Sequence, residues 1–276
     1  MACRTWRALR VAGFSRLQSS TALSVVLMGG WAPAVSAQGT AGGQSLEQAA
    51  SDPTASLMSV QIQDIYTGSY HNLDDGSGNA VALRAAVPFQ TGSLKHIARA
   101  TLPMITDSPS GAEGVSDLVL FDLVVFDQSW GRWGAGPVAL LPTASDDRIG
   151  AEKWAAGPAI GFTARSGKLM WGLFDQNLFS FAGKGDRDDV NVSILQPIIN
   201  YALPGKWSIG TSEMNLTYDY EKHEWVALPL GLKLARLVKF DGLPVQFSGA
   251  YEYNFDDDDV VAEWTVNLTV KFLFPL

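Results

Sequence analysis

The segment DVVAEWTVNLTVKFLF, which spans residues 259–274, decides the fold. Its even positions are apolar and its odd positions are mostly polar: Val260, Ala262, Trp264, Val266, Leu268, Val270, Phe272 and Phe274 against Asp259, Val261, Glu263, Thr265, Asn267, Thr269, Lys271 and Leu273. This period of two predicts a β-strand with one apolar face, because successive side chains of a strand point to opposite sides. Soluble strands usually run about 5–6 residues, whereas a transmembrane strand needs about 9–11. The segment suggests a transmembrane β-barrel. Standing alone it would favour the alternative, an edge strand of a soluble sandwich, so the rest of the chain decides between the two.

The rest of the chain repeats this rhythm of alternating segments separated by turn residues. We expect an all-β fold, a transmembrane antiparallel up-and-down β-barrel of about twelve strands. Two of the segments, residues 168–181 and 190–203, alternate poorly, and we expect a β-bulge in each. The expected strands are residues 58–70, 79–89, 95–105, 116–126, 131–142, 153–165, 168–181, 190–203, 206–219, 224–237, 243–256 and 259–274.

The N-terminus is typical of a secretory signal peptide, which we predict over residues 1–37. A basic region with four arginines precedes an apolar core at residues 21–31, and small residues before Ala37 form a cleavage site. Cleavage removes Cys3, the only cysteine of the chain. The small, polar residues 38–56 predict a flexible periplasmic lead-in, and residues 57–276 the transmembrane barrel.

The connections between the expected strands fall into two sets. Longer connections such as residues 182–189 and 255–259 are acidic, whereas shorter ones such as residues 165–168 and 203–206 carry much of the Lys and Arg. Outer-membrane barrels have long extracellular loops and short periplasmic turns, so the acidic set is expected outside the cell. The formal net charge of −8 makes a nucleic-acid partner unfavourable.

Four segments resemble a known family: LLPTASDDRIGAEKWAAGPAIGF (140–162), LQPIINYALPGKW (195–207), WVALPLGLKL (225–234) and FLFP (272–275). They resemble bacterial outer-membrane proteins named for the meta-pathway of phenol degradation, also labelled "neuromedin U" and transporter-like. The resemblance covers most of the chain after the signal peptide and is strongest from Leu140 onward. It implies a Gram-negative outer-membrane barrel that takes up aromatic or other hydrophobic compounds.

Charged residues on the strands are the candidate functional residues. A Lys or Arg facing lipid at the bilayer midplane costs about 2–4 kcal/mol, so we expect these side chains to point into the lumen. They can line a conducting pore whose charges set selectivity, or they can pair with one another in a plugged lumen. The predicted lumen and substrate-pathway residues are Arg84, Arg99, Asp122, Arg132, Lys153, Arg165, Glu213, Lys233, Glu252, Glu263 and Lys271.

The predicted function is passive uptake of small molecules through a channel or transporter in the cell outer membrane. The alternatives are a non-conducting structural barrel, an outer-membrane enzyme acting on lipid, and a soluble periplasmic β-protein. No catalytic residue is predicted, because His71, His96 and His223 are assigned to different loops and turns and no G-x-S-x-G motif is present.

No cofactor is expected, and no metal site beyond one weak candidate. The acidic run Asp256, Asp257, Asp258 and Asp259 offers carboxylate oxygens to a hard cation, but a solvated acidic rim is the favoured interpretation. The expected partners are outer-membrane lipid, lipopolysaccharide, the outer-membrane assembly machinery and a small-molecule cargo. The sequence does not give the oligomeric state.

Overall fold

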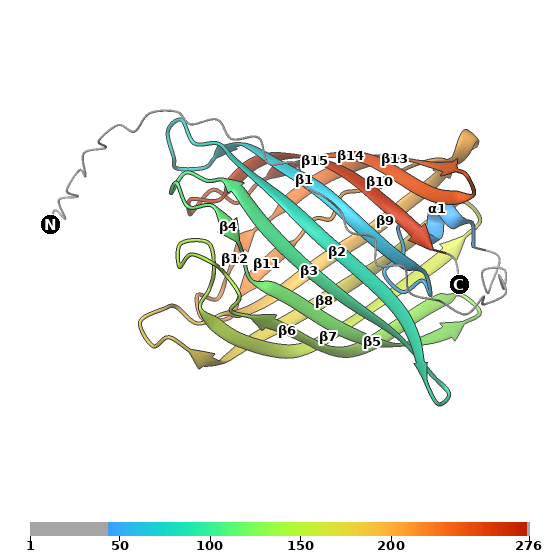
Figure 1. Cartoon of the computed structure of the whole chain (residues 1–276), viewed down its shortest axis with the longest axis horizontal. Helices are drawn as coiled ribbons and strands as arrows, with labels where there is room; N and C mark the ends of the chain where they lie inside the picture. Colours follow the sequence, from blue (N-terminus) through green and yellow to red (C-terminus); the bar gives the residue numbers. More distant parts are fainter. Residues whose placement is uncertain (1–43, 275–276) are drawn as a thin grey trace, which may run out of the picture. The chain divides into compact units, whose positions relative to one another are not determined.

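A computed structural model describes residues 44–274, and over this range the chain forms a closed antiparallel barrel of twelve strands (Figure 1). Some strands are interrupted, so that β4 and β5, β10 and β11, and β12 and β13 each make up one strand of the barrel. The elements are α1 (Leu46–Ala49), β1 (Met58–Tyr70), β2 (Gly78–Thr91), β3 (Leu94–Asp107), β4 (Gly114–Val115), β5 (Leu118–Gln128), β6 (Gly131–Leu141), β7 (Lys153–Ser166), β8 (Leu169–Gly183), β9 (Asn191–Leu203), η1 (Pro204–Lys206), β10 (Trp207–Thr211), β11 (Leu216–Asp219), β12 (Glu224–Ala227), β13 (Pro229–Phe240), β14 (Leu243–Asn254) and β15 (Ala262–Phe274).

Each of the twelve barrel strands, with the interrupted ones counted as one, pairs with its neighbours in the sequence, and the ring closes where β15 pairs antiparallel with β1. The seam begins with Met58 opposite Phe274 and continues to Tyr70 opposite Ala262. The all-β fold and the twelve strands predicted from the sequence are confirmed within the described residues. Among these residues, no helix is long and apolar enough to cross a membrane.

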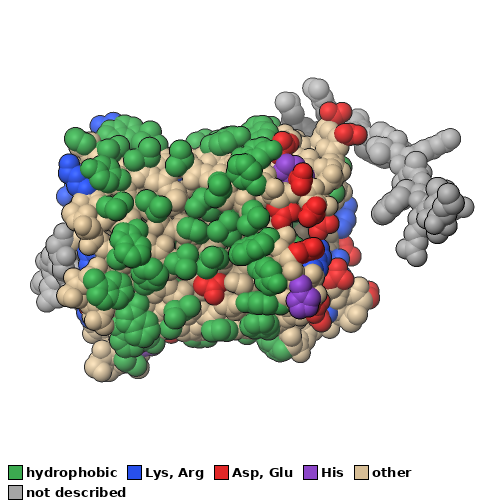
Figure 2. All heavy atoms as spheres, turned by 180° about the vertical axis from the view of Figure 1, so that it is seen from behind, with side chains coloured by type: hydrophobic (Ala, Val, Ile, Leu, Met, Phe, Trp, Pro, Cys, Tyr) green, Lys and Arg blue, Asp and Glu red, His purple; other side chains and the backbone are tan. Residues whose placement is uncertain are grey.

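The two faces of β15 are as the sequence predicts. Outward positions such as Leu268 are exposed, whereas the inward Asn267 and Leu273 are buried. On the face that Figure 2 shows, outward apolar side chains form a broad band between two polar ends. This is the surface that a lipid bilayer requires.

Outward aromatic rings gather near both edges of this band. At the end with the short turns, Phe162 contacts both Trp130 and Trp171, with ring centroids 6.2 and 5.6 Å away. At the opposite end, Trp264 contacts Tyr66 and Tyr251, at 5.9 and 6.2 Å. Aromatic belts of this kind are typical of the two membrane–water interfaces.

The two ends of the barrel differ in charge. We call the end formed by residues 92–93, 129–130, 167–168, 204–206 and 241–242 the short-turn end, and the opposite end the long-loop end. On the face that Figure 2 shows, acidic side chains gather at the long-loop end, together with some Lys and Arg, whereas Lys and Arg mark the short-turn end. The two predicted sets of connections are therefore separated in space.

In the long loops, hydrogen bonds from the Arg148 guanidinium hold the pKa of the Asp146 carboxyl well below its usual range.

One of the two predicted bulges lies where it was expected. In β8 the register shifts between the pairs Trp154–Ala182 and Ala155–Ser180, which leaves Phe181 as the extra residue. The predicted bulge in residues 190–203 is wrong, since β9 keeps one continuous register with β8. The irregularity lies in the facing strand instead, between β10 and β11.

The break between β10 and β11 follows from Pro197 of β9, which has no backbone N–H to offer. At this point the Thr211 hydroxyl, in place of a backbone group, makes the hydrogen bonds to β9. It donates to Pro197 O and accepts from Ile199 N, both at 3.1 Å. Residues 212–215 then cross this gap without strand pairing. The break brings Glu213 into the lumen.

The apolar cluster inside the barrel generates a stability prediction. Phe174 is fully buried, and its ring lies 5.4 Å from that of Phe121. The Phe174→Ala substitution should lower the free energy of unfolding by about 3–5 kcal/mol, because it leaves a cavity in a packed cluster. Urea unfolding in detergent micelles or lipid vesicles measures this loss.

Phe181→Ala is the matched control, since Phe181 lies on the same strand but is 69% exposed on the outer face. Its effect should be much smaller. Equal losses for the two variants would contradict the placement of the cluster inside the barrel.

Candidate functional site

The lumen of the barrel has two unlike walls. Inward residues of β13, β14, β15, β1 and β2 form a polar wall, which includes Ser59, Gln61, Arg84, Lys233, Gln246, Thr269 and Lys271. Inward residues of β3 and β5–β9 form an apolar wall, which includes Ile97, Phe121, Leu123, Val138, Phe174 and Leu178. A cavity lies between the two walls and is lined by residues of both.

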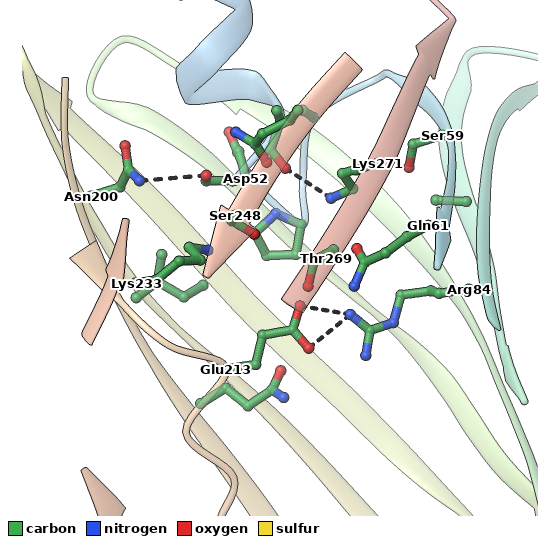
Figure 3. A pocket seen from close by; sticks show the side chains of 18 of the residues that line it. Asp52, Ser59, Gln61, Arg84, Asn200, Glu213, Lys233, Ser248, Thr269 and Lys271 are labelled. Carbon is green, nitrogen blue, oxygen red and sulfur yellow. Dashed lines mark hydrogen bonds and ion pairs between the residues drawn. The ribbon is translucent and has the colours of Figure 1, made fainter. Parts of the chain in front are cut away.

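Charged side chains surround this cavity at mid-height, and we call Arg84, Arg99, Glu213, Lys233 and Lys271 the waist. Arg84 Nη1 donates to both carboxylate oxygens of Glu213, at 2.7 and 2.8 Å (Figure 3). Arg84 is held in place by a third hydrogen bond, from its Nε to Thr101 Oγ1 at 3.2 Å. The waist therefore contains one fixed ion pair and three further cations.

Arg99 lies at the border between the two walls. Its guanidinium carbon is 4.2 Å from the centroid of the Phe121 ring and 5.8 Å from that of Phe174. A cation over an aromatic face is attracted by the ring quadrupole, which holds Arg99 against the apolar wall. Within the described residues, no carboxylate lies within 4.0 Å of Arg99.

The N-terminal segment, residues 44–57, lies inside the short-turn end of the barrel. It contacts inward residues from many strands: Asn200 of β9 donates to Ser51 at 3.4 Å, and Lys271 of β15 donates to Ala50 O at 2.8 Å (Figure 3). Its Ala49, Ala50, Ala55 and Leu57 form an apolar cluster with Leu237 and Leu273. The segment forms the floor of the cavity on this side.

Asp52 is the most connected residue of the N-terminal segment, and its side chain is fully buried. It accepts hydrogen bonds from Thr54, Thr163 and Gln44, and its carboxylate lies 3.4 Å from Arg132 Nη1. Arg132 also donates to Thr54 O and to the Gln44 side chain. A buried charge pair with this many hydrogen bonds resists opening, because removal of one partner leaves the other uncompensated.

These contacts concern part of the predicted lead-in over residues 38–56. Residues 44–56 contact the barrel wall from inside, whereas residues 38–43, like the predicted signal peptide and its cleavage site, lie outside the described residues. The flexibility of this lead-in stays a prediction.

Of the predicted lumen residues, the structure brings five together at the waist. Five more point inward but lie toward the two ends, and the last, Asp122, does not face the lumen. Arg132 and Arg165 lie at the short-turn end, on β6 and β7. Lys153, Glu252 and Glu263 lie toward the long-loop end, where Lys153 pairs with Asp189 at 2.8 Å and Glu263 accepts from Ser69 at 2.6 Å.

The prediction that Asp122 faces the lumen is wrong. Its strand neighbours Phe121 and Leu123 are buried in the apolar wall, so Asp122 points outward, where its carboxylate lies 3.0 Å from His96 Nδ1. The sequence misled because both faces of residues 118–126 are apolar, so no alternation fixed the phase. The assignment of Asp122 therefore depended only on the expectation that charged residues of the strands face the lumen, and that expectation fails here.

Two further outward carboxylates went unnoticed in the sequence, and each has polar partners. Asp64 accepts from Asn79 at 3.0 Å. Asp175 accepts from Asn177 at 2.6 Å and from Ser193 at 2.7 Å. Hydrogen bonds of this kind offset the cost of polar groups on an apolar surface.

The sequence analysis also missed the uncharged part of the polar wall and the role of Asp52. Gln61 and Gln63 are buried and inward, and their alternation with Val60 and Ile62 carries the signal. No such signal exists for Asp52, because it lies in a segment without periodicity.

Over residues 44–274, no group of three or more His, Cys, Asp or Glu side chains is arranged to hold a metal ion, the acidic run at 256–259 included.

A scan against models of protein families found no match, and a search of curated proteins found none. Among solved structures, the chain is similar in fold to the COG4313 outer membrane channel from Pseudomonas putida F1, with 17% sequence identity, a TM-score of 0.55, and coverage of 79% of this chain and 94% of that chain. Outer membrane phospholipase A from Escherichia coli also matches, with 9% identity, a TM-score of 0.43, and coverage of 79% and 92%. The first of these similarities agrees with the barrel fold, and the resemblance to the phenol-degradation family stays a prediction.

The contacts of Asp52 generate a prediction about the N-terminal segment. The Arg132→Met substitution leaves the Asp52 carboxylate without its cation, which should release the segment from the wall. Hydrogen exchange followed by mass spectrometry should show faster exchange of the amides of residues 45–57, while the strands stay protected.

Glu47→Gln is the control, since Glu47 has no ion pair within 4.0 Å in the described residues. It should leave the exchange of residues 45–57 unchanged. Slow exchange in Arg132→Met would contradict the role assigned to Asp52.

Proposed function

We propose that this chain is an outer-membrane channel through which small molecules, aromatic or other hydrophobic compounds among them, pass by diffusion. The observation that carries the proposal is the cavity at the waist, with the polar wall on one side and the apolar wall on the other. A barrel that only had to be stable has no need of partly exposed cations around an interior space, because unpaired charges cost free energy. A pathway for solutes explains them.

The N-terminal segment must move, or shift aside, for a solute to leave at the short-turn end. Its apolar cluster with Leu237 and Leu273 is small, and most of its remaining contacts are hydrogen bonds to inward side chains. Water in an open lumen can replace such hydrogen bonds, so their net contribution is only about 0.5–1.5 kcal/mol each. The Asp52–Arg132 pair is the exception and is proposed to be the main restraint.

The proposed location is the cell outer membrane, after export directed by residues 1–37. The apolar band and its aromatic edges support a membrane location, with the acidic long loops outside the cell. Outer-membrane lipid, lipopolysaccharide and the assembly machinery are the proposed partners, and the phenol-degradation family suggests an aromatic cargo.

An enzyme acting on lipid remains the alternative, and one observation bears on it. His96 and Asp122 form a pair on the outer face, where a lipid substrate would lie. A hydrolase of this kind also needs a nucleophile, such as a Ser hydroxyl, that is hydrogen-bonded to the other nitrogen of the His ring. Within residues 44–274, His96 Nε2 has no hydrogen-bond partner.

Conductance in a planar bilayer tests the proposed function. The folded chain from residue 38 should give discrete current steps, and deletion of residues 44–56 should raise the step size, because this segment occupies the short-turn end. Silence of both forms, each shown to be folded, would overturn the channel. An assay for lipid hydrolysis, with His96→Ala as the comparison, would then separate an enzyme from a structural barrel.

A further inference from the structure

We propose that the waist selects small organic anions with an apolar body, such as an aromatic carboxylate, by holding the anionic head on Lys233 and Arg99. The inference rests on the proposed function, because it names the class of solute that the same cavity takes. It is carried by the charges around the cavity and by the position of the apolar wall.

The charges that line the cavity do not balance. Four cations line it, namely Arg84, Arg99, Lys233 and Lys271, whereas the lining carboxylates within the described residues are Asp52 and Glu213. Both carboxylates are engaged, Asp52 with Arg132 and its hydroxyl donors, and Glu213 with Arg84. The cavity therefore has an excess of positive charge that no lining group neutralises.

Two of the cations are open to a ligand. In the part of the chain that the structure describes, neither Lys233 nor Arg99 has a carboxylate within 4.0 Å, and the Arg99 guanidinium lies over the Phe121 ring. Figure 3 shows Lys233 and Lys271 beside the same cavity as Arg84, with the Lys271 ammonium directed at Ala50 O of the N-terminal segment. An anion placed there compensates charges that are otherwise partly desolvated.

A further donor lies on the same wall. Gln246 is 5% exposed and lines the cavity, yet its Nε2 has no hydrogen-bond partner within residues 44–274. A buried donor without a partner is unfavourable, and an acceptor oxygen in the cavity would satisfy it. An anionic head group supplies such oxygens.

The apolar wall sets the second requirement on the ligand. The Phe121 ring lies directly under the Arg99 guanidinium, so an anion bound to Arg99 is next to an aromatic and aliphatic surface. A purely polar anion leaves this surface in contact with water, whereas a ligand with an apolar body covers it. A neutral aromatic compound covers it but leaves Lys233 and Arg99 unpaired, and a cation is repelled.

Ligand-detected NMR titrations on the folded full-length mature chain in detergent micelles test this inference. The probes are benzoate, benzyl alcohol, which lacks the charge, and acetate, which lacks the apolar body. Benzoate should bind at least about tenfold more tightly than either, where tenfold corresponds to about 1.4 kcal/mol. Equal binding of benzoate and benzyl alcohol would overturn the inference.

Lys233→Gln should weaken benzoate binding by about tenfold, and Lys233→Arg, which keeps the charge, should restore it. Lys239→Gln is the matched control, because Lys239 lies on the same strand but is exposed at the short-turn end. A Lys233→Gln variant that is folded and binds benzoate like the native chain would contradict the proposal. Should Lys233→Gln not fold, Arg99→Gln serves as the second variant with the same expectation.

Flux into proteoliposomes separates the two proposals. If benzoate binds but does not cross the membrane, the proposed selectivity of the waist stands and the proposed channel function is ruled out. Benzoate and benzyl alcohol that cross equally fast, with equal binding, leave the channel standing and remove the selectivity.

Discussion

The structure depends on the closure of one ring of backbone hydrogen bonds. Pairing of β15 with β1 leaves no free edge, which is what allows a sheet to stand in lipid, where an unpaired backbone N–H or C=O costs several kcal/mol. Closure also gives every strand residue one of two environments, lumen or outer surface. The alternation of apolar and polar residues from residue 259 onward follows from these two environments.

Inside the ring, the filling of the lumen determines what the barrel can do. The apolar wall packs as a core around Phe121 and Phe174, so this side of the interior is filled by side chains. The polar wall cannot pack in this way, since its charges and amides need partners or water. A cavity therefore lies at the waist, and the N-terminal segment bounds it at the short-turn end.

The sequence predicted the features that closure imposes and missed those that depend on contacts between distant segments. The strand number, the faces of β15 and the two sets of connections follow from local periodicity, and the structure agrees. Asp122 was misplaced because β5 is apolar on both faces, one turned to the lumen core and one to the outer surface. Asp52 carries no local signal at all, because its partners Arg132 and Thr163 come from strands far along the chain.

The central claim, that solutes pass through the lumen and past the N-terminal segment, is tested most directly by locking that segment in place. Ser51 and Asn200 are in contact, with 3.4 Å between Asn200 Nδ2 and Ser51 Oγ, so Ser51→Cys and Asn200→Cys are introduced together in a chain with Cys3 replaced, and formation of the disulfide on oxidation is verified by mass spectrometry. The account predicts that the oxidised protein carries little current in a planar bilayer and that a reducing agent restores it. Equal currents before and after reduction, with the disulfide verified, would contradict a pathway that runs past this segment.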